Sequence, residues 1–168
     1  MDLLHFNTLD TPAAASVLRP CLDVDRWIDS IVDSRPFGSI EDLVAQAGLA
    51  ASSLSEEEIA SALAHHPRIG ERAEGGSTEA TLSREEQSAL ALDDGIKKSL
   101  SAGNRAYEQR FDRVFLIRAA GRSSEEILAE LDRRLSNADE EETREVGQQL
   151  REIALLRLDA LFESVSAS

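Results

Sequence analysis

Apolar residues recur every three or four positions along most of this chain of 168 residues, which is the spacing of one face of an α-helix. The period is clearest in three groups of side chains: Trp27, Ile28, Ile31 and Val32; Ile127, Leu128, Leu131 and Leu135; and Val146, Leu150 and Ile153. Glycine (9) and proline (4) are scarce, and no run of alternating Val, Ile or Thr predicts a strand. We therefore predict an all-α fold, a single compact domain of roughly eight helices over residues 1–168.

Capping residues mark the expected helix starts. Four segments have the spacing of a capping box, in which a serine is followed three residues later by an acidic residue: Ser39–Asp42, Ser55–Glu58, Ser83–Glu86 and Ser123–Glu126. Thr11 followed by Pro12 is typical of a cap with proline in the first helical turn. The helix that starts at Ser55 is expected to end near His65, because Pro67 disfavours helical backbone at the residue before it.

The middle of the chain combines a loop with a long apolar stripe. A loop is expected over residues 68–80, which hold three of the nine glycines and no apolar period. The next stripe runs from Ser83 past Gly103 to Phe115, and it predicts one kinked helix or two abutting helices. A last long helix is expected from Asp139 to Phe162.

The charge and the composition exclude several kinds of partner. Lys and Arg number 18 and Asp and Glu number 32, so the formal net charge is −14. This charge opposes binding to the phosphates of nucleic acids and to anionic membranes. One cysteine, Cys21, and three histidines provide neither a disulfide nor a Cys/His zinc site. No secretion signal or long apolar span is apparent, so we expect a cytoplasmic protein with no nucleic-acid or membrane partner.

The segment His65-His66-Pro67-Arg68-Ile69-Gly70 places two histidines at the end of an expected helix, where the helix dipole favours a protonated imidazole. Pro67 holds His66 extended, so His66 could present a proton donor at a fixed angle. In the alternative interpretation one histidine caps backbone carbonyls and the other is solvated. Metal binding is not expected, because neighbouring histidines rarely face one ion and the only other imidazole is that of His5.

The segment Ser83-Arg84-Glu85-Glu86-Gln87 has two interpretations that concern different atoms. In the first, Ser83 and Glu86 cap the backbone amides of a helix that starts here. In the second, this helix N-terminus is an anion site, where Glu86 adds an acceptor and Gln87 an amide that can hold a ureide-like edge.

Arg157 occupies an unusual place on the last predicted helix. At 100° per residue from Val146, Leu150 lies at about 40° and Arg157 at about 20°, so this arginine projects from the centre of the apolar stripe. A buried guanidinium must meet an anion. That anion is either a structural Asp or Glu, or a substrate carboxylate that the guanidinium binds through two parallel hydrogen bonds.

These segments, in this order, resemble the family of 2-oxo-4-hydroxy-4-carboxy-5-ureidoimidazoline (OHCU) decarboxylases of urate breakdown. The resemblance covers most of the chain and is strongest in HHPRIG (65–70), SREEQ (83–87), NRAYEQRF (104–111), FLIRAAGRS (115–123), EILAELDRRLSN (126–137) and EIALLRLDAL (152–161). Two positions depart from the family pattern. Asp112 stands where glycine is expected, and Arg118 stands where many members have a small or sulfur-bearing residue.

The resemblance implies an all-α carboxy-lyase, often a homodimer, that uses no cofactor and no metal. It would convert OHCU, an anionic ureidoimidazoline, to (S)-allantoin in urate and purine breakdown. His66 would be the catalytic histidine and Glu86 its carboxylate partner. The implied substrate contacts are Pro67, Ser83, Glu86, Gln87 and Arg157, with main-chain groups of Ile117, Ala119 and Ala120. Because the chain is acidic, we expect Arg157, the helix start at Ser83 and a protonated His66 to reverse the charge locally.

Two alternatives remain beside this function. One is a non-catalytic acidic helical interaction module that docks a basic partner, since caps alone explain every expected helix start. The other is a different small-anion lyase on the same scaffold, which would bind ureides without this turnover.

Overall fold

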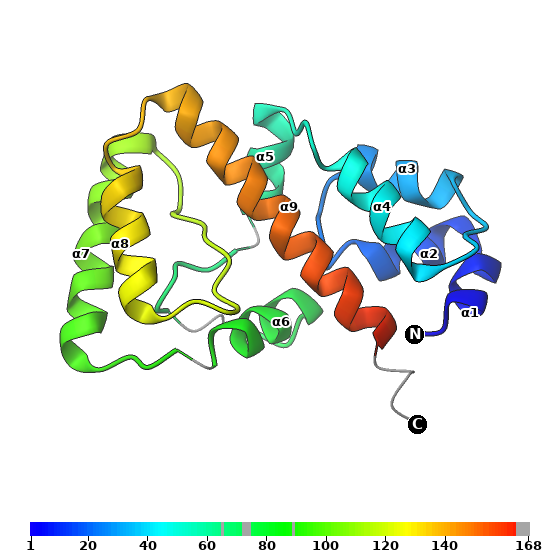
Figure 1. Cartoon of the computed structure of the whole chain (residues 1–168), viewed down its shortest axis with the longest axis horizontal. Helices are drawn as coiled ribbons and strands as arrows, with labels where there is room; N and C mark the ends of the chain where they lie inside the picture. Colours follow the sequence, from blue (N-terminus) through cyan, green and yellow to red (C-terminus); the bar gives the residue numbers. More distant parts are fainter. Residues whose placement is uncertain (65, 72–74, 89, 164–168) are drawn as a thin grey trace. The chain divides into compact units, whose positions relative to one another are not determined.

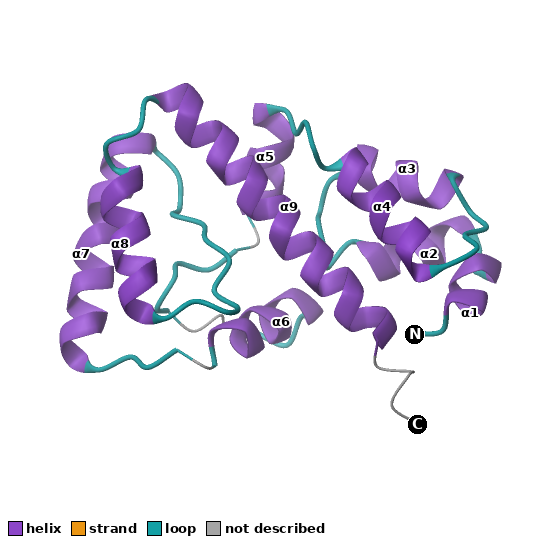
Figure 2. Cartoon of the chain, viewed as in Figure 1, coloured by secondary structure: helices purple, strands orange, loops and turns teal. Residues whose placement is uncertain are grey.

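The computed structural model describes residues 1–64, 66–71, 75–88 and 90–163, and every regular element in these ranges is an α-helix (Figure 2). The predicted all-α class is confirmed. The chain forms two compact units, one of residues 1–62 and 150–168 and one of residues 63–149. Helix α9, Asp139–Glu163, contributes its first part to the second unit and its remainder to the first.

The first unit is built around a core of aromatic and aliphatic side chains. Its helices are α1 (Leu3–Thr8), α2 (Thr11–Leu18), α3 (Asp25–Asp33), α4 (Ile40–Ala50), nearly all of α5 (Glu56–Leu63) and the end of α9. Helices α2, α3 and α4 lie side by side (Figure 1). Trp27 is fully buried, and its indole Nε1 donates to the Ala47 carbonyl at 2.9 Å. Phe6 and Phe162 meet edge to face, with ring centroids 5.6 Å apart.

Most of the predicted caps of this unit are confirmed. Ser39 Oγ accepts the Asp42 N–H at 3.1 Å at the start of α4. Ser55 and Glu58 exchange hydrogen bonds of 2.9 and 3.1 Å and form a complete capping box. The predicted cap at Thr11 is wrong, because the preceding residue, Asp10, accepts the Ala13 N–H at 2.8 Å. The Asp10 carboxylate, one position before Thr11, therefore caps the backbone amides at the start of α2.

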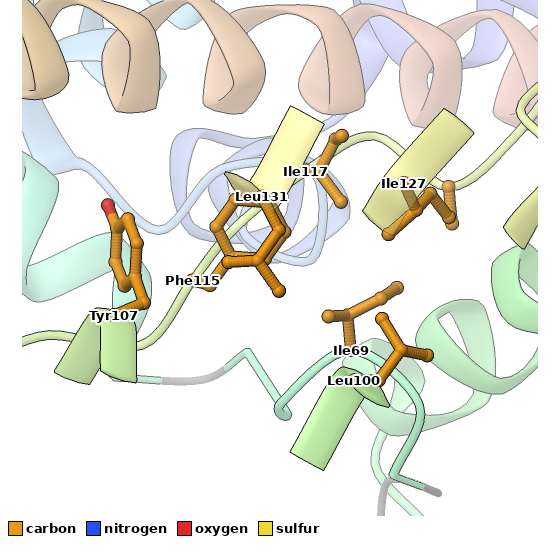
Figure 3. Packing of buried hydrophobic residues seen from close by; sticks show 8 residues of the cluster. Ile69, Leu100, Tyr107, Phe115, Ile117, Ile127 and Leu131 are labelled. Carbon is orange, nitrogen blue, oxygen red and sulfur yellow. The ribbon is translucent and has the colours of Figure 1, made fainter. Parts of the chain in front are cut away.

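The second unit has a smaller core between helices and loops. It contains α6 (Thr78–Gln87), α7 (Asp94–Phe111), α8 (Ser124–Arg134) and the start of α9. Figure 3 shows its buried cluster, which consists of Ile69, Leu100, Tyr107, Phe115, Ile117, Ala119, Ile127 and Leu131. Helices α7 and α8 lie side by side (Figure 1), and a Cβ added at Gly103 would lie 2.3 Å from Leu131 Cδ2. Gly103 therefore lets the two helices approach closely.

The expected helix from Ser83 onward is wrong in its start, its break and its end. The cap of α6 is Ser77, whose Oγ accepts the Ala80 N–H at 3.1 Å, so the expected loop over residues 68–80 ends three residues early. Ser83 lies inside α6 and is buried, as is Ala80 three positions before it, so both lie on the buried face of this helix. The break falls between α6 and α7, not at Gly103, because Asp93 caps α7 and accepts the Ile96 N–H at 2.8 Å.

The remaining predictions for this unit hold. Ser123 Oγ accepts the Glu126 N–H at 3.1 Å and caps α8. The last long helix begins at Asp139, as predicted, and α5 ends at Leu63, close to the expected position. Among the described residues, no helix has both the length and the apolar character needed to cross a membrane.

Candidate functional site

The segment after α5, residues 66–71, is named here the histidine loop. The His66 N–H donates to the Leu63 carbonyl at 3.1 Å, which continues the chain directly from the end of α5. His66 and Pro67 are both half-buried. His65, whose part in the site the sequence leaves open, lies outside the described residues.

Two hydrogen bonds attach the histidine loop to the helices around it. Ile69 is 5% exposed and packs beside Leu100 of α7 (Figure 3), while its carbonyl accepts the Asn104 Nδ2 at 3.0 Å. The Gly70 N–H donates to Gln87 Oε1 at 3.0 Å, and Gly70 has φ +86°, a backbone that favours glycine. The loop is therefore fixed to α7 through Ile69 and to α6 through Gly70.

A third attachment lies at the surface. The guanidinium of Arg68 binds the carboxylate of Glu108 on α7 through two hydrogen bonds, of 2.5 Å from Nε and 3.1 Å from Nη2. These hydrogen bonds lower the pKa of Glu108 from its usual value of 4.5, with the charge of Arg68 adding to the effect and desolvation opposing it. Both side chains are partly exposed, so the pair orients the loop more than it stabilises the fold.

The end of α6 provides a pocket of about 520 Å³. The described residues that line it are Gly70, Glu71, Ser83, Arg84, Glu85, Gln87, Ser88, Leu92 and Lys97. Ser83 and Gln87 are one turn apart on α6 and share a face. Because Oε1 of Gln87 accepts from Gly70, Nε2 is the atom of this amide that can donate to a ligand.

Two of the predicted site residues lie around this pocket. Ser83 and Gln87 line it together, and Gly70 connects it to the histidine loop. His66, Pro67 and Glu86 are described and half-buried, and they lie outside the set of residues that line it. Ser83 is not at a helix N-terminus, so the predicted anion site built on the start of a helix there is wrong.

The segment between α7 and α8 contains the predicted main-chain contacts. Ile117 and Ala119 are buried in the core cluster and Ala120 is half-buried. The Arg118 N–H donates to Gln149 Oε1 at 2.8 Å, which fixes the backbone at this point. Asp112, the departure from the expected glycine, ends α7 with φ +56°, a left-handed conformation that aspartate tolerates better than most residues.

A buried ion pair supports this segment, and the sequence analysis missed it. Arg134 is 1% exposed and Glu142 is 0% exposed; Nε of Arg134 donates to Glu142 Oε1 at 2.9 Å, and Nη2 of Arg134 binds the same carboxylate. Nη1 of Arg134 donates to the Leu116 carbonyl at 2.7 Å. The position of each residue around its helix could have revealed the pair. At 100° per residue, Arg134 lies about 20° from the buried Ile127 on α8, and Glu142 lies about 40° from the buried Val146 on α9.

Arg157 belongs to the first unit. Its predicted burial is confirmed at 5% exposed, and its Nη1 donates to the Pro20 carbonyl at 2.8 Å. A contact of Arg157 with substrate stays a prediction. No group of three or more His, Cys, Asp or Glu side chains suited to hold a metal ion occurs within the described ranges.

Comparisons with known proteins identify relatives over nearly the whole chain. The family model of OHCU decarboxylase matches residues 7–159. A 2-oxo-4-hydroxy-4-carboxy-5-ureidoimidazoline decarboxylase of Haloferax volcanii is 27% identical over 169 residues, which cover 98% of this chain and 98% of the relative.

Two solved structures share the fold. A crystal structure of OHCU decarboxylase in the presence of (S)-allantoin has a TM-score of 0.69 and 20% identity, and the match covers 86% of this chain and 96% of that one. A crystal structure of (S)-allantoin synthase has a TM-score of 0.71 and 17% identity, and the match covers 96% of this chain and 54% of that one.

Proposed function

Because the chain belongs to the OHCU decarboxylase family, whose model matches residues 7–159, we propose that it decarboxylates OHCU and releases (S)-allantoin, with His66 as general acid/base. The observation that carries the proposal is the joint placement of Ser83, Gln87 and Gly70 around one pocket. Gly70 and Glu71, which line the pocket, belong to the histidine loop that also contains His66.

The substrate itself explains why few residues suffice. When the C–C bond to the carboxylate breaks, its electron pair stays on the ring carbon, and the neighbouring ring C=N bond accepts it. Pyridoxal or thiamin would otherwise supply such an electron sink. The protein's tasks are then to orient the ring and to deliver a proton.

Ser83 and Gln87 would orient the ureido arm. The Ser83 hydroxyl can donate and accept, and the Gln87 amide can donate through Nε2. A ureido group has a carbonyl acceptor and N–H donors, so these side chains match both of its edges. The contact of Gly70 with Oε1 holds the Gln87 amide in one orientation before substrate binds, which reduces the entropy lost on binding.

His66 would handle the protons. In this mechanism it takes the proton of the substrate hydroxyl and returns it to carbon on a single face of the enol-like intermediate, while the ring nitrogen that accepted the electron pair gains a proton from water. Glu86 would orient the imidazole. Delivery to one face yields only the S enantiomer, whereas OHCU that decays unaided gives racemic allantoin.

Arg157 is proposed to bind the anionic edge of the substrate, and Pro67 with the backbone of Ile117, Ala119 and Ala120 is proposed to complete the contacts. We also propose that the chain functions as a homodimer, as the sequence resemblance implies. Size-exclusion chromatography with light scattering tests the dimer directly, and a monomer mass would contradict it.

The test of function generates OHCU from urate with urate oxidase and hydroxyisourate hydrolase and follows optical activity with and without this protein. We expect rapid accumulation of (S)-allantoin only in its presence. A racemic product at the unaided rate would contradict the proposal and favour a non-catalytic interaction module. Ureide binding without turnover would favour a different lyase.

Two variants test the roles of the residues. His66→Asn should keep the helical circular dichroism and lose stereoselective turnover; native-rate formation of the S enantiomer would overturn the role of His66. Arg157→Ala should raise KM by about tenfold or more, since a charged hydrogen bond contributes about 1.5–3 kcal/mol. An unchanged KM with lower thermal stability would instead assign Arg157 a purely structural role.

A further inference from the structure

We propose that Asn104 is a positioning residue, which sets the placement of His66 by holding the Ile69 carbonyl. The inference rests on the proposed function, because it concerns how the acid/base of that reaction is held. Asn104 Nδ2 donates to the Ile69 carbonyl at 3.0 Å, across 35 residues of sequence. Ile69 follows His66 by three residues, so this bond lies within about 10 Å of chain from the histidine.

The place of Asn104 in the fold makes its side chain a rigid anchor. It lies well inside α7, an 18-residue helix, and is 4% exposed. Its neighbours one turn away on the same face, Leu100 and Tyr107, are fully buried in the core cluster. Because Leu100 and Tyr107 hold this part of α7 in the core, the Ile69 carbonyl takes its position from α7.

The other two attachments of the histidine loop are less suited to this task. Gln87 is only half-buried, whereas Asn104 is 4% exposed, although it borders a smaller cavity of about 220 Å³ beside Arg68 and Glu108. Arg68 and Glu108 form their pair at the surface, where water competes for both groups. Asn104 therefore supplies the buried anchor of the loop among the attachments that the structure describes.

Asn104 holds this bond at a cost to the fold. Its Oδ1 is buried and has no hydrogen-bond partner in the described part of the chain. A buried acceptor without a partner destabilises a protein, and an apolar side chain of similar size would avoid that loss but leave the Ile69 carbonyl without its donor. The hydrogen bond to Ile69 is therefore the one interaction that this amide supplies among the described residues.

The test compares Asn104→Leu with Asn7→Leu. Asn7 makes the same kind of bond in the first unit, from Nδ2 to the Phe37 carbonyl at 2.9 Å, and its Oδ1 also accepts the Phe37 N–H at 2.9 Å. It has no part in the proposed site, so its variant controls for the loss of side-chain-to-backbone hydrogen bonds. Turnover is measured with enough of each variant to outpace unaided decay, so that kcat, KM and the fraction of S product all report the enzyme. Thermal unfolding is measured on the same samples.

We expect Asn104→Leu to lower kcat by about 10- to 100-fold, as a displacement of about 1 Å at a reacting group does, and to lower the fraction of S product. KM should change by less than about threefold, since the lining of the pocket is intact. Asn7→Leu should keep kcat and the S product. Asn104→Ala serves as a second variant in case leucine does not fit, with the same expected loss of kcat.

A kcat within twofold of wild type in Asn104→Leu would overturn the inference, as would a loss that matches the fraction of unfolded protein. NMR of the His66 imidazole, assigned with His66→Asn, provides a readout that needs no turnover. Its resonances should move in Asn104→Leu and stay in Asn7→Leu, and unmoved resonances would also overturn the inference. If the wild-type protein itself leaves OHCU untouched, the proposed function fails, while these resonances still decide the role of Asn104.

Discussion

Removal of either member of the buried Arg134–Glu142 pair should destabilise the second unit strongly. Glu142 is 0% exposed and accepts the Tyr107 hydroxyl at 2.6 Å and Asn137 Nδ2 at 3.0 Å, besides the guanidinium. Glu142→Leu leaves a buried cation without its anion, and Arg134→Met leaves a buried anion without its cation. Each change should cost about 3–5 kcal/mol of unfolding free energy. At about 2–4 °C per kcal/mol, the melting temperature should fall by about 6–20 °C.

The double variant separates the ion pair from its surroundings. Arg134→Met with Glu142→Leu removes both charges and leaves two polar groups without a partner, the Leu116 carbonyl and the Tyr107 hydroxyl. At about 1 kcal/mol for each, the double variant should lose only about 2 kcal/mol, much less than the sum of the single losses.

The assay is thermal and urea unfolding followed by circular dichroism for wild type, both single variants and the double. Arg133→Met is the matched control. Arg133 is the neighbouring residue on α8, is 50% exposed and pairs with Glu130 at 2.8 Å and with Glu145 at 2.5 Å, so its loss should cost about 1 kcal/mol or less for each surface pair. Single losses below about 1 kcal/mol, or losses that simply add in the double variant, would refute the reasoning.

Two further predictions concern α7. Because the pKa of Glu108 is lowered in the folded state by its hydrogen bonds to Arg68, the pair stabilises the protein above pH 4.5, and this contribution is lost as pH falls through the lowered pKa. The free energy of unfolding by urea should therefore be lower for Glu108→Gln than for wild type at pH 7, and the two should be equal at pH 2. The same difference at both pH values would contradict this assignment. Gly103→Ala should lower stability, because a Cβ 2.3 Å from the buried Leu131 overpacks the contact by about 1–3 kcal/mol, against about 1 kcal/mol gained in helix propensity. A rise in melting temperature would show that Leu131 can move aside.

The helix boundaries were predictable where cap and apolar period agree. Ser39, Ser55 and Ser123 stand immediately before an apolar stripe, and each caps the expected helix. At α6, Ser77 and Ser83 are both candidate caps, and the residue type alone does not distinguish a capping serine from a buried one. Ser77 is the cap, and Ser83 lies inside α6 with 3% of its surface exposed, a burial that the local spacing does not indicate.

The candidate site was predictable in its residues and much less in its supports. Ser83 and Gln87 were expected together, and they line one pocket. The anchors of the histidine loop reach across 35 residues from Asn104 and 40 residues from Glu108, and no local period indicates such pairs. Buried charges on helices can be predicted, because a charged residue that falls on the apolar face of a helix is recognised from its position in the helical repeat.

The electrostatics of the pocket also differ from the expectation. A chain with net charge −14 was expected to attract its anionic substrate partly through a helix N-terminus at Ser83. The last turn of α6 lies there instead, and the dipole of that end is negative. Among the described residues of the pocket lining, the charges of Arg84 and Lys97 balance those of Glu71 and Glu85. The described lining can therefore orient a ureido group by hydrogen bonds, while preference for an anion is the role proposed for a protonated His66 and for Arg157.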